Sequence, residues 1–81
     1  MNYEFERALS QLGGKTIAHV VVKEGVRAGP AAQLFLVFTD GTYYELFNTS
    51  SAFRGASGLD HGELPDVLAD GAPNQKVIYQ C

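Results

Sequence analysis

Three groups that can bind a metal or transfer a proton lie within four residues of each other: Asp60, His61 and Glu63. A metal site or a catalytic carboxylate–imidazole pair uses these side-chain types. A closed metal site needs about four ligands, however, and the other candidates lie elsewhere: His19 in an apolar segment and Cys81 as the last residue. We therefore interpret this stretch as an exposed polar loop that leads into a helix, and we expect no catalytic residue, no metal and no cofactor. A small metal- or ligand-binding module that uses the loop stays open as an alternative.

No other motif in the sequence indicates catalysis. His19 has apolar neighbours on both sides, and we interpret it as a half-buried strand histidine with one hydrogen bond. The serine- and glycine-containing stretch at residues 55–58 lacks the lysine that a phosphate-binding loop needs. The lone Cys81 provides neither a disulfide nor a thiol pair for structural zinc. We expect a protein that is not an enzyme.

Aromatic and acidic side chains are better candidates for a function, because together they can form a surface that binds another protein. Aromatic residues and arginine are enriched where protein partners make their strongest contacts. The acids are concentrated in residues 55–81, which hold four acids and the single base Lys76 and so carry the whole net charge of −3. Because Asp66 and Asp70 are four residues apart, they share one face of a helix. We expect the partner-binding residues to be Tyr44, Phe53, Arg54, Asp60, Glu63, Asp66 and Asp70.

Both features also have a purely structural explanation. The aromatic rings of a small sheet commonly pack in its core or pair across strands. A row of acids can be the solvated side of a short helix. The sequence leaves both explanations open.

Composition and charge place the chain among small folded proteins. Of its 81 residues, 46% are hydrophobic and 19% are charged, which is typical of one globular domain over residues 1–81 and not of a disordered chain. The net charge of −3 argues against direct nucleic-acid binding. No apolar run approaches the ~20 residues that span a bilayer, and Glu4 and Glu6 stand where a signal peptide needs basic residues. We expect a cytoplasmic protein that does not contact a membrane.

A β-hairpin centred on the Asp-Gly pair at residues 40–41 organises the rest of the chain. Apolar, aromatic-rich runs lie on both sides of this pair within residues 34–47, and that arrangement is a strong hairpin signal. Two turns fit: a two-residue turn, which pairs Phe38 with Tyr43, and a three-residue turn, which pairs Val37 with Tyr43. The sequence does not choose between them.

The segments before the hairpin are a helix and a strand. Residues 34–38 are all apolar, so the first hairpin strand needs cover on both faces. An amphipathic helix over residues 2–12 supplies this cover on one face. A β-branched strand over residues 15–23 follows, and alternation places Ile17 and His19 on the same face.

The segments after the hairpin are a loop, a short helix and a last strand. Residues 48–62 are rich in Ser, Gly and Asn and read mostly as loop. Residues 63–71 indicate a helix, with Pro65 in its first turn and Gly71 at its end. Residues 76–80 form the last strand.

Together these elements predict an α+β fold. We expect a small antiparallel sheet of about four strands, arranged as a meander centred on the hairpin at residues 33–47. An N-terminal helix packs on one face of this sheet, and a short second helix precedes the last strand.

The function that we expect is a small, non-enzymatic protein-interaction domain. One specific form is a phage- or mobile-element-encoded inhibitor that binds a host protein complex through its acidic and aromatic surface. The partner would then be a basic protein and not nucleic acid. The alternative is a homodimeric structural protein that pairs through its edge strand, residues 76–80, because an exposed strand edge is a template for pairing.

Overall fold

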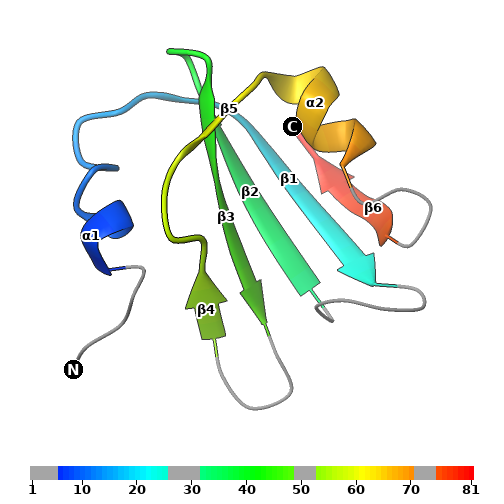
Figure 1. The fold of residues 1–81 in the computed structure, drawn as a ribbon. Coiled ribbons are helices and arrows are strands. Elements are labelled where there is room, and N and C mark those ends of the chain that lie inside the picture. The colour runs from blue at the N-terminus through cyan, green and yellow to red at the C-terminus, as the bar shows by residue number, and fades with distance from the viewer. Residues whose placement is uncertain (1–5, 26–31, 49–52, 71–74) are drawn as a thin grey trace.

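The computed structural model describes residues 6–25, 32–48, 53–70 and 75–81 of the chain. Within these ranges the chain forms one antiparallel sheet and two short helices, which makes it a mixed α+β protein (Figure 1). The strands lie in the order β4-β3-β2-β1-β6, and β5 also pairs with β3. The elements in chain order are α1 (Glu6–Leu9), β1 (Ile17–Gly25), β2 (Ala32–Phe38), β3 (Thr42–Asn48), β4 (Phe53–Gly55), β5 (Asp60–His61), α2 (Leu64–Ala69) and β6 (Gln75–Gln80). Neither helix in the described ranges is long and apolar enough to cross a membrane.

The predicted hairpin is confirmed and forms the middle of the sheet. β2 and β3 pair with Val37 opposite Tyr43, which is the register of the three-residue turn. Gly41 has the positive φ (82°) that this turn requires and that glycine adopts without steric cost. Oδ1 of Asp40 accepts a hydrogen bond from the Thr42 N–H at 3.1 Å and so closes the turn.

Both faces of β2 are covered, as its apolar sequence predicts. Alternate residues of the strand enter two separate hydrophobic clusters. One cluster lies under α2, and its buried members are Val21, Phe35, Val37 and Val67. The other lies on the opposite face, and its buried members are Ala8, Phe38 and Tyr44.

A bulge in β1 changes the faces of its first residues. Ile17 pairs with Phe38 but His19 pairs with Val37, so Ala18 is an extra residue between two successive pairs. Successive residues of β2 point to opposite faces, and their partners do the same. The expectation that Ile17 and His19 share a face is therefore wrong, and His19 lies on the side of α2.

In the described residues the sheet has six strands, so the predicted four-strand meander is wrong. The segment at residues 48–62, expected as loop, supplies β4 and β5, which are 3 and 2 residues long and too short to show an alternating pattern. β6 does not continue the meander but pairs with β1, so that it forms the opposite edge of the sheet from β4 (Figure 1). It can do so because the rest of the meander uses only one edge of β1.

The helical cover also differs from the prediction. Within the described residues, the helix expected over residues 2–12 is the single turn α1, and its expected cap Asn2 lies outside them. The backbone tightens after α1, where the N–H groups of Gln11 and Leu12 bond to carbonyl groups three residues earlier instead of four. α1 therefore contributes only Ala8 to the buried core, and α2 covers the other face of the sheet.

A buried lysine fixes the end of α2 to the sheet. Lys23 of β1 is only 1% exposed. Its ammonium donates hydrogen bonds to the carbonyl oxygens of Val67 and Asp70 at the C-terminal end of the helix, and it lies 5.0 Å from the centre of the Phe35 ring. The Val67 carbonyl also accepts from the Asp70 N–H at 3.3 Å. Burial lowers the pKa of Lys23, although the carboxylates of Asp70 and Glu45 raise it in part. Nothing in the sequence pattern indicated that this lysine would be buried.

Candidate functional site

Carboxylates gather over the α2 side of the sheet, and we call this surface the acidic face: Glu45, Asp60, Glu63, Asp66 and Asp70. Most of them act on a single phenol, that of Tyr43. Its pKa is raised above the usual value, first because the side chain is half-buried and then because of the negative charges of Asp60, Asp70, Glu45 and Asp66. Carboxylates from β3, β5 and α2 therefore lie close enough to one tyrosine to oppose its ionisation.

The backbone brings these three elements together at the start of α2. β5 pairs with β3 so that Asp60 lies opposite Tyr43. Gly62 then passes so close to the sheet that a Cβ atom there would come within 2.9 Å of Cε1 of Tyr43 and 3.2 Å of Cβ of Asp66. The Gly62 N–H also donates to the Gly41 carbonyl at 2.8 Å. A glycine at this position therefore allows α2 to begin directly beside the Tyr43 ring.

The first residues of α2 hold their carboxylates in place. The helix expected over residues 63–71 has Glu63 at its N-cap and Pro65 in its first turn, where a missing N–H leaves no bond unmade. The Glu63 N–H donates to Oδ2 of Asp66 at 2.8 Å, which fixes the Asp66 carboxylate. Asp70 follows four residues later, and its N–H donates to the Asp66 carbonyl at 3.1 Å. Asp66 and Asp70 thus lie on one side of the helix, as their spacing predicts.

Little positive charge compensates the acidic face. Within the described ranges, the salt bridge that forms is the one between Lys15 and Asp40, in the hairpin turn. No carboxylate of the acidic face has a salt bridge to a basic side chain of those ranges. The ammonium of Lys23 lies beneath the surface and is turned toward backbone carbonyl groups. The acidic face therefore presents a net negative charge to solvent.

The remaining partner-binding residues expected from the sequence lie apart from the acidic face. Phe53, which is 57% exposed, and Arg54 lie on β4, which pairs with the last residues of β3, whereas Asp60 pairs near its start. Tyr44 is fully buried, and its hydroxyl donates to the Ala56 carbonyl at 2.7 Å. Tyr44 belongs to the buried cluster on the opposite face of the sheet from the acidic face, and because it is buried it forms no exposed aromatic surface with Phe53.

The polar loop around His61 is partly a strand. Asp60 and His61 form β5, and successive strand residues point to opposite faces, so the carboxylate and the imidazole diverge. The described part of the chain contains no group of three or more His, Cys, Asp or Glu side chains placed to hold a metal ion.

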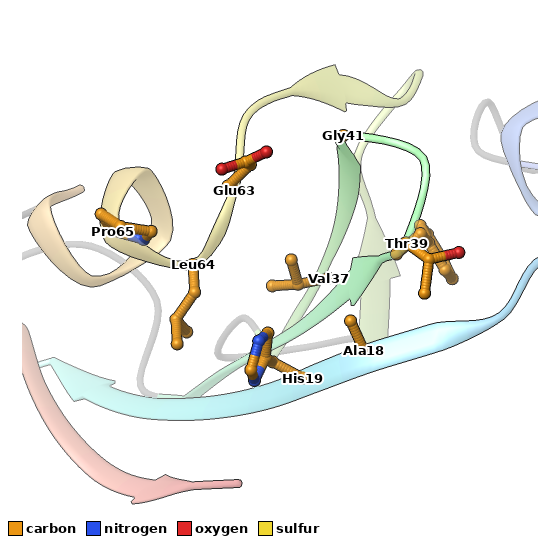
Figure 2. Close-up of a pocket in the computed structure, with 9 residues that line it drawn as sticks. Ala18, His19, Val37, Thr39, Gly41, Glu63, Leu64 and Pro65 are labelled. Carbon is orange, nitrogen blue, oxygen red and sulfur yellow. The ribbon is translucent and has the colours of Figure 1, made fainter.

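A pocket of about 510 Å³ lies next to the acidic face and shares Glu63 with it (Figure 2). It is bounded by the bulge of β1, the end of β2, the hairpin turn and the start of α2. Val37 and Leu64 give it apolar walls, and His19 and Glu63 are polar residues that line it. Nδ1 of His19 lies 3.0 Å from the carbonyl oxygen of Cys81. His19 is thus half-buried with one hydrogen bond, as the sequence predicts.

Sequence reasoning missed Tyr43 and Glu45 as parts of the site, and it missed the pocket. Alternation along β3 places Tyr43 and Glu45 on one face, so a signal for these two residues was present. The pocket gave no such signal, because it forms only when the bulge at Ala18 meets the helix that begins at Leu64.

The chain was compared with protein families, curated proteins and solved structures. No protein-family model, curated protein or solved structure matches the chain. Function is therefore inferred from the charges, burial and geometry described above.

Proposed function

We propose that this chain is a small, non-enzymatic interaction domain whose acidic face binds a basic surface of another protein. The observation that carries the proposal is the concentration of carboxylates from three elements around Tyr43, without a salt bridge to a described basic side chain. Such a surface attracts a partner of opposite charge over about a Debye length, ~10 Å at 0.1 M salt. It also fixes the orientation in which the two proteins meet.

The same concentration of charge costs folding stability in the free domain. Asp66 and Asp70 repel each other across one helical turn, an effect of roughly 0.2–0.5 kcal/mol for exposed pairs. The charges around Tyr43 add to this repulsion. A basic partner removes the repulsion, so the free energy that the free domain loses is recovered in the complex.

A more specific proposal is that the domain acts by covering a basic surface that another complex needs. A small phage- or mobile-element-encoded inhibitor of a host protein complex works by such occupation, without chemistry of its own. The exposed side chains of Phe53 and Arg54 on β4 add the residue types found at interface hot spots.

The test compares two double variants that change the net charge equally. Asp66→Asn/Asp70→Asn removes two charges from the acidic face, and Glu6→Gln/Glu24→Gln removes two from exposed positions outside it. The partner is captured from lysate at low salt, identified and purified, and its affinity for the three proteins is measured at several salt concentrations. We expect the first variant to bind more weakly and with less salt dependence, and the second to bind like the unmodified protein. Equal weakening by both variants, or no partner at low salt, would contradict the proposal.

A second candidate, a homodimer through β6, is favoured by the sheet order. Among the described strands, β6 pairs with β1 alone and so has one unpaired edge. Ile78 and Tyr79 on this strand are 48% and 54% exposed, and Lys76 is its only charged residue, so little blocks pairing with a second copy. Light scattering over a range of concentrations should then detect a dimer that Ile78→Lys dissociates. A monomer at every concentration would remove this candidate.

A further inference from the structure

One part of the pocket beside the acidic face has apolar walls that suit a chain of methylenes, and the rest of its lining is polar. Val37 is almost fully buried at its base. Ala18, Leu64 and Pro65 line it from β1 and α2, and Figure 2 shows the Leu64 side chain directed from α2 toward the strand that carries His19. A volume of about 510 Å³ accommodates a long side chain. Concave pockets that combine apolar walls with a few placed polar groups are the usual form of binding sites.

Two polar side chains of the pocket, His19 and Glu63, can accept hydrogen bonds, and Thr39 adds a hydroxyl that both donates and accepts. A carbonyl oxygen can only accept, so Nδ1 of His19, at 3.0 Å from the Cys81 carbonyl, carries the proton of this hydrogen bond. Nε2 of the neutral ring is then an acceptor. Glu63, on the segment that leads into α2 (Figure 2), adds an exposed carboxylate.

Donors for an anion are few at the same place. No lysine or arginine lines the pocket, and the Lys15 ammonium, 5.5 Å from the centre of the Phe38 ring, is paired with Asp40. At the start of α2, the Glu63 N–H bonds to the Asp66 carboxylate at 2.8 Å, the Asp66 N–H bonds to the Glu63 carbonyl at 3.0 Å, and Pro65 has no N–H. The nearby charges of the acidic face are negative as well. The pocket therefore selects a positively charged group over a negatively charged one.

The geometry points to a pocket for one cationic side chain, lysine or arginine, from the protein that binds the acidic face. Its aliphatic stem packs on Val37 and Leu64, and its charged head reaches Glu63 and Nε2 of His19. Lysine and arginine bury their stems on apolar surface while the charged end stays polar, and a residue seated in a pocket is the usual anchor of an interface. This inference rests on the proposed function, because it names the chemistry with which the partner engages the same surface.

The experiment uses small probes that isolate the side chain from the rest of a partner. The full chain labelled with ¹⁵N is titrated with n-pentylammonium, 1-pentanol and pentanoate at constant ionic strength, and amide shifts are followed. We expect n-pentylammonium to move the amides of Ala18, Val37 and Leu64 saturably. It should bind about two- to fivefold more tightly than 1-pentanol, which is the range for a partly exposed ion pair, and pentanoate should not bind. Absence of a saturable shift with n-pentylammonium, or equal binding of pentanoate, would overturn the inference.

Two pairs of variants locate the binding. Ala18→Phe fills the pocket, whereas Ala69→Phe adds the same ring at an exposed position of α2 outside it. Only the first should abolish the shifts, provided that its amide spectrum shows a folded protein. Glu63→Gln should reduce the affinity for n-pentylammonium to that for 1-pentanol, and Glu24→Gln should not. Undiminished binding to Ala18→Phe would place the probe elsewhere and refute the assignment.

The outcomes separate this inference from the proposed function. If Asp66→Asn/Asp70→Asn weakens the partner but the pocket binds no probe, the acidic face is an interface and the pocket assignment alone is wrong. If the probe binds but the partner is insensitive to those substitutions, the pocket stands as a cation site and the proposed function fails.

Discussion

The hairpin turn and the acidic face both expose carboxylates on the same small sheet, but they hold them differently. In the turn, the Asp40 carboxylate pairs with Lys15 and accepts hydrogen bonds from the N–H and hydroxyl of Thr42. The hydrogen bond from Lys15, followed by those from Thr42, lowers the pKa of Asp40 to about 2. On the acidic face, negative charges instead add to the burial that raises the pKa of Tyr43.

This difference distinguishes a charge that the fold uses from one that it leaves available. The hydrogen bonds of the Asp40 carboxylate are made within the molecule, where they stabilise a three-residue turn. Asp60 and Asp70 are exposed and have no salt bridge to a described basic side chain. Lys23, on which the charge of Asp70 acts, is buried and directs its donors to backbone carbonyl groups. A partner would therefore meet the full charge of the acidic face and little of that in the turn.

The largest loss of stability should come from Lys23→Met, which removes the buried cation beneath the acidic face. The Asp70 carbonyl would lose the lysine donor, and the Val67 carbonyl would keep only the Asp70 N–H at 3.3 Å. A buried group left without its partner costs about 1–3 kcal/mol. Chemical denaturation should show this loss of stability, and hydrogen exchange should show α2 opening more often. Lys76→Met, at an exposed position of β6, should be close to neutral. A stability equal to that of the unmodified protein would show that the lysine does not anchor the helix.

The cost of Lys23→Met should also depend on pH. Because burial lowers the pKa of Lys23 in the folded protein, the unfolded chain binds more protons between that lowered value and 10.5, so this group makes folding more favourable as pH rises through the window. The variant lacks the group, so the difference in unfolding free energy between the two proteins should grow toward pH 10.5 and then level off. A difference that shrinks over this range would mean that Lys23 prefers to be charged in the folded state.

A smaller effect, present at neutral pH and lost in acid, is expected for Asp40→Asn. The amide keeps an oxygen for the Thr42 N–H but loses the charge that pairs with Lys15. Because the folded-state pKa of Asp40 is depressed from 3.8 to about 2, its contribution to stability is present above pH 3.8 and is lost as pH falls through about 2. The unfolding temperature of the variant should therefore be lower than that of the unmodified protein at neutral pH, and the two temperatures should converge in acid. Asp60→Asn, which breaks no salt bridge, should show no such convergence.

The parts that could be predicted from the sequence are those held by local contacts. Residues 34–47 carry their own turn and alternation, so the hairpin and the two faces of β2 follow from the pattern. Lys23 and Asp70 are separated by 47 residues, and no local pattern indicates that a strand lysine will cap a distant helix. Tyr44 illustrates the same limit, because alternation separates it from Tyr43, but its burial depends on residues distant in the sequence, such as Ala8 and Leu59, that join the same cluster.

The smallest expected effect is a change in the pKa of Tyr43, and it tests most directly how the acidic face differs from the hairpin turn. In Asp66→Asn/Asp70→Asn this pKa should fall but stay above the usual value, because burial and the remaining carboxylates still raise it. The pKa of Tyr44 is raised by burial alone, so the same substitutions should leave it unchanged. Titration of the ¹³Cζ resonances separates the two rings, and the double variant that leaves the acidic face intact is the control. If the two tyrosines moved together, a general loosening of the sheet would explain the shift, and the carboxylates of α2 would not be acting on Tyr43 as charges.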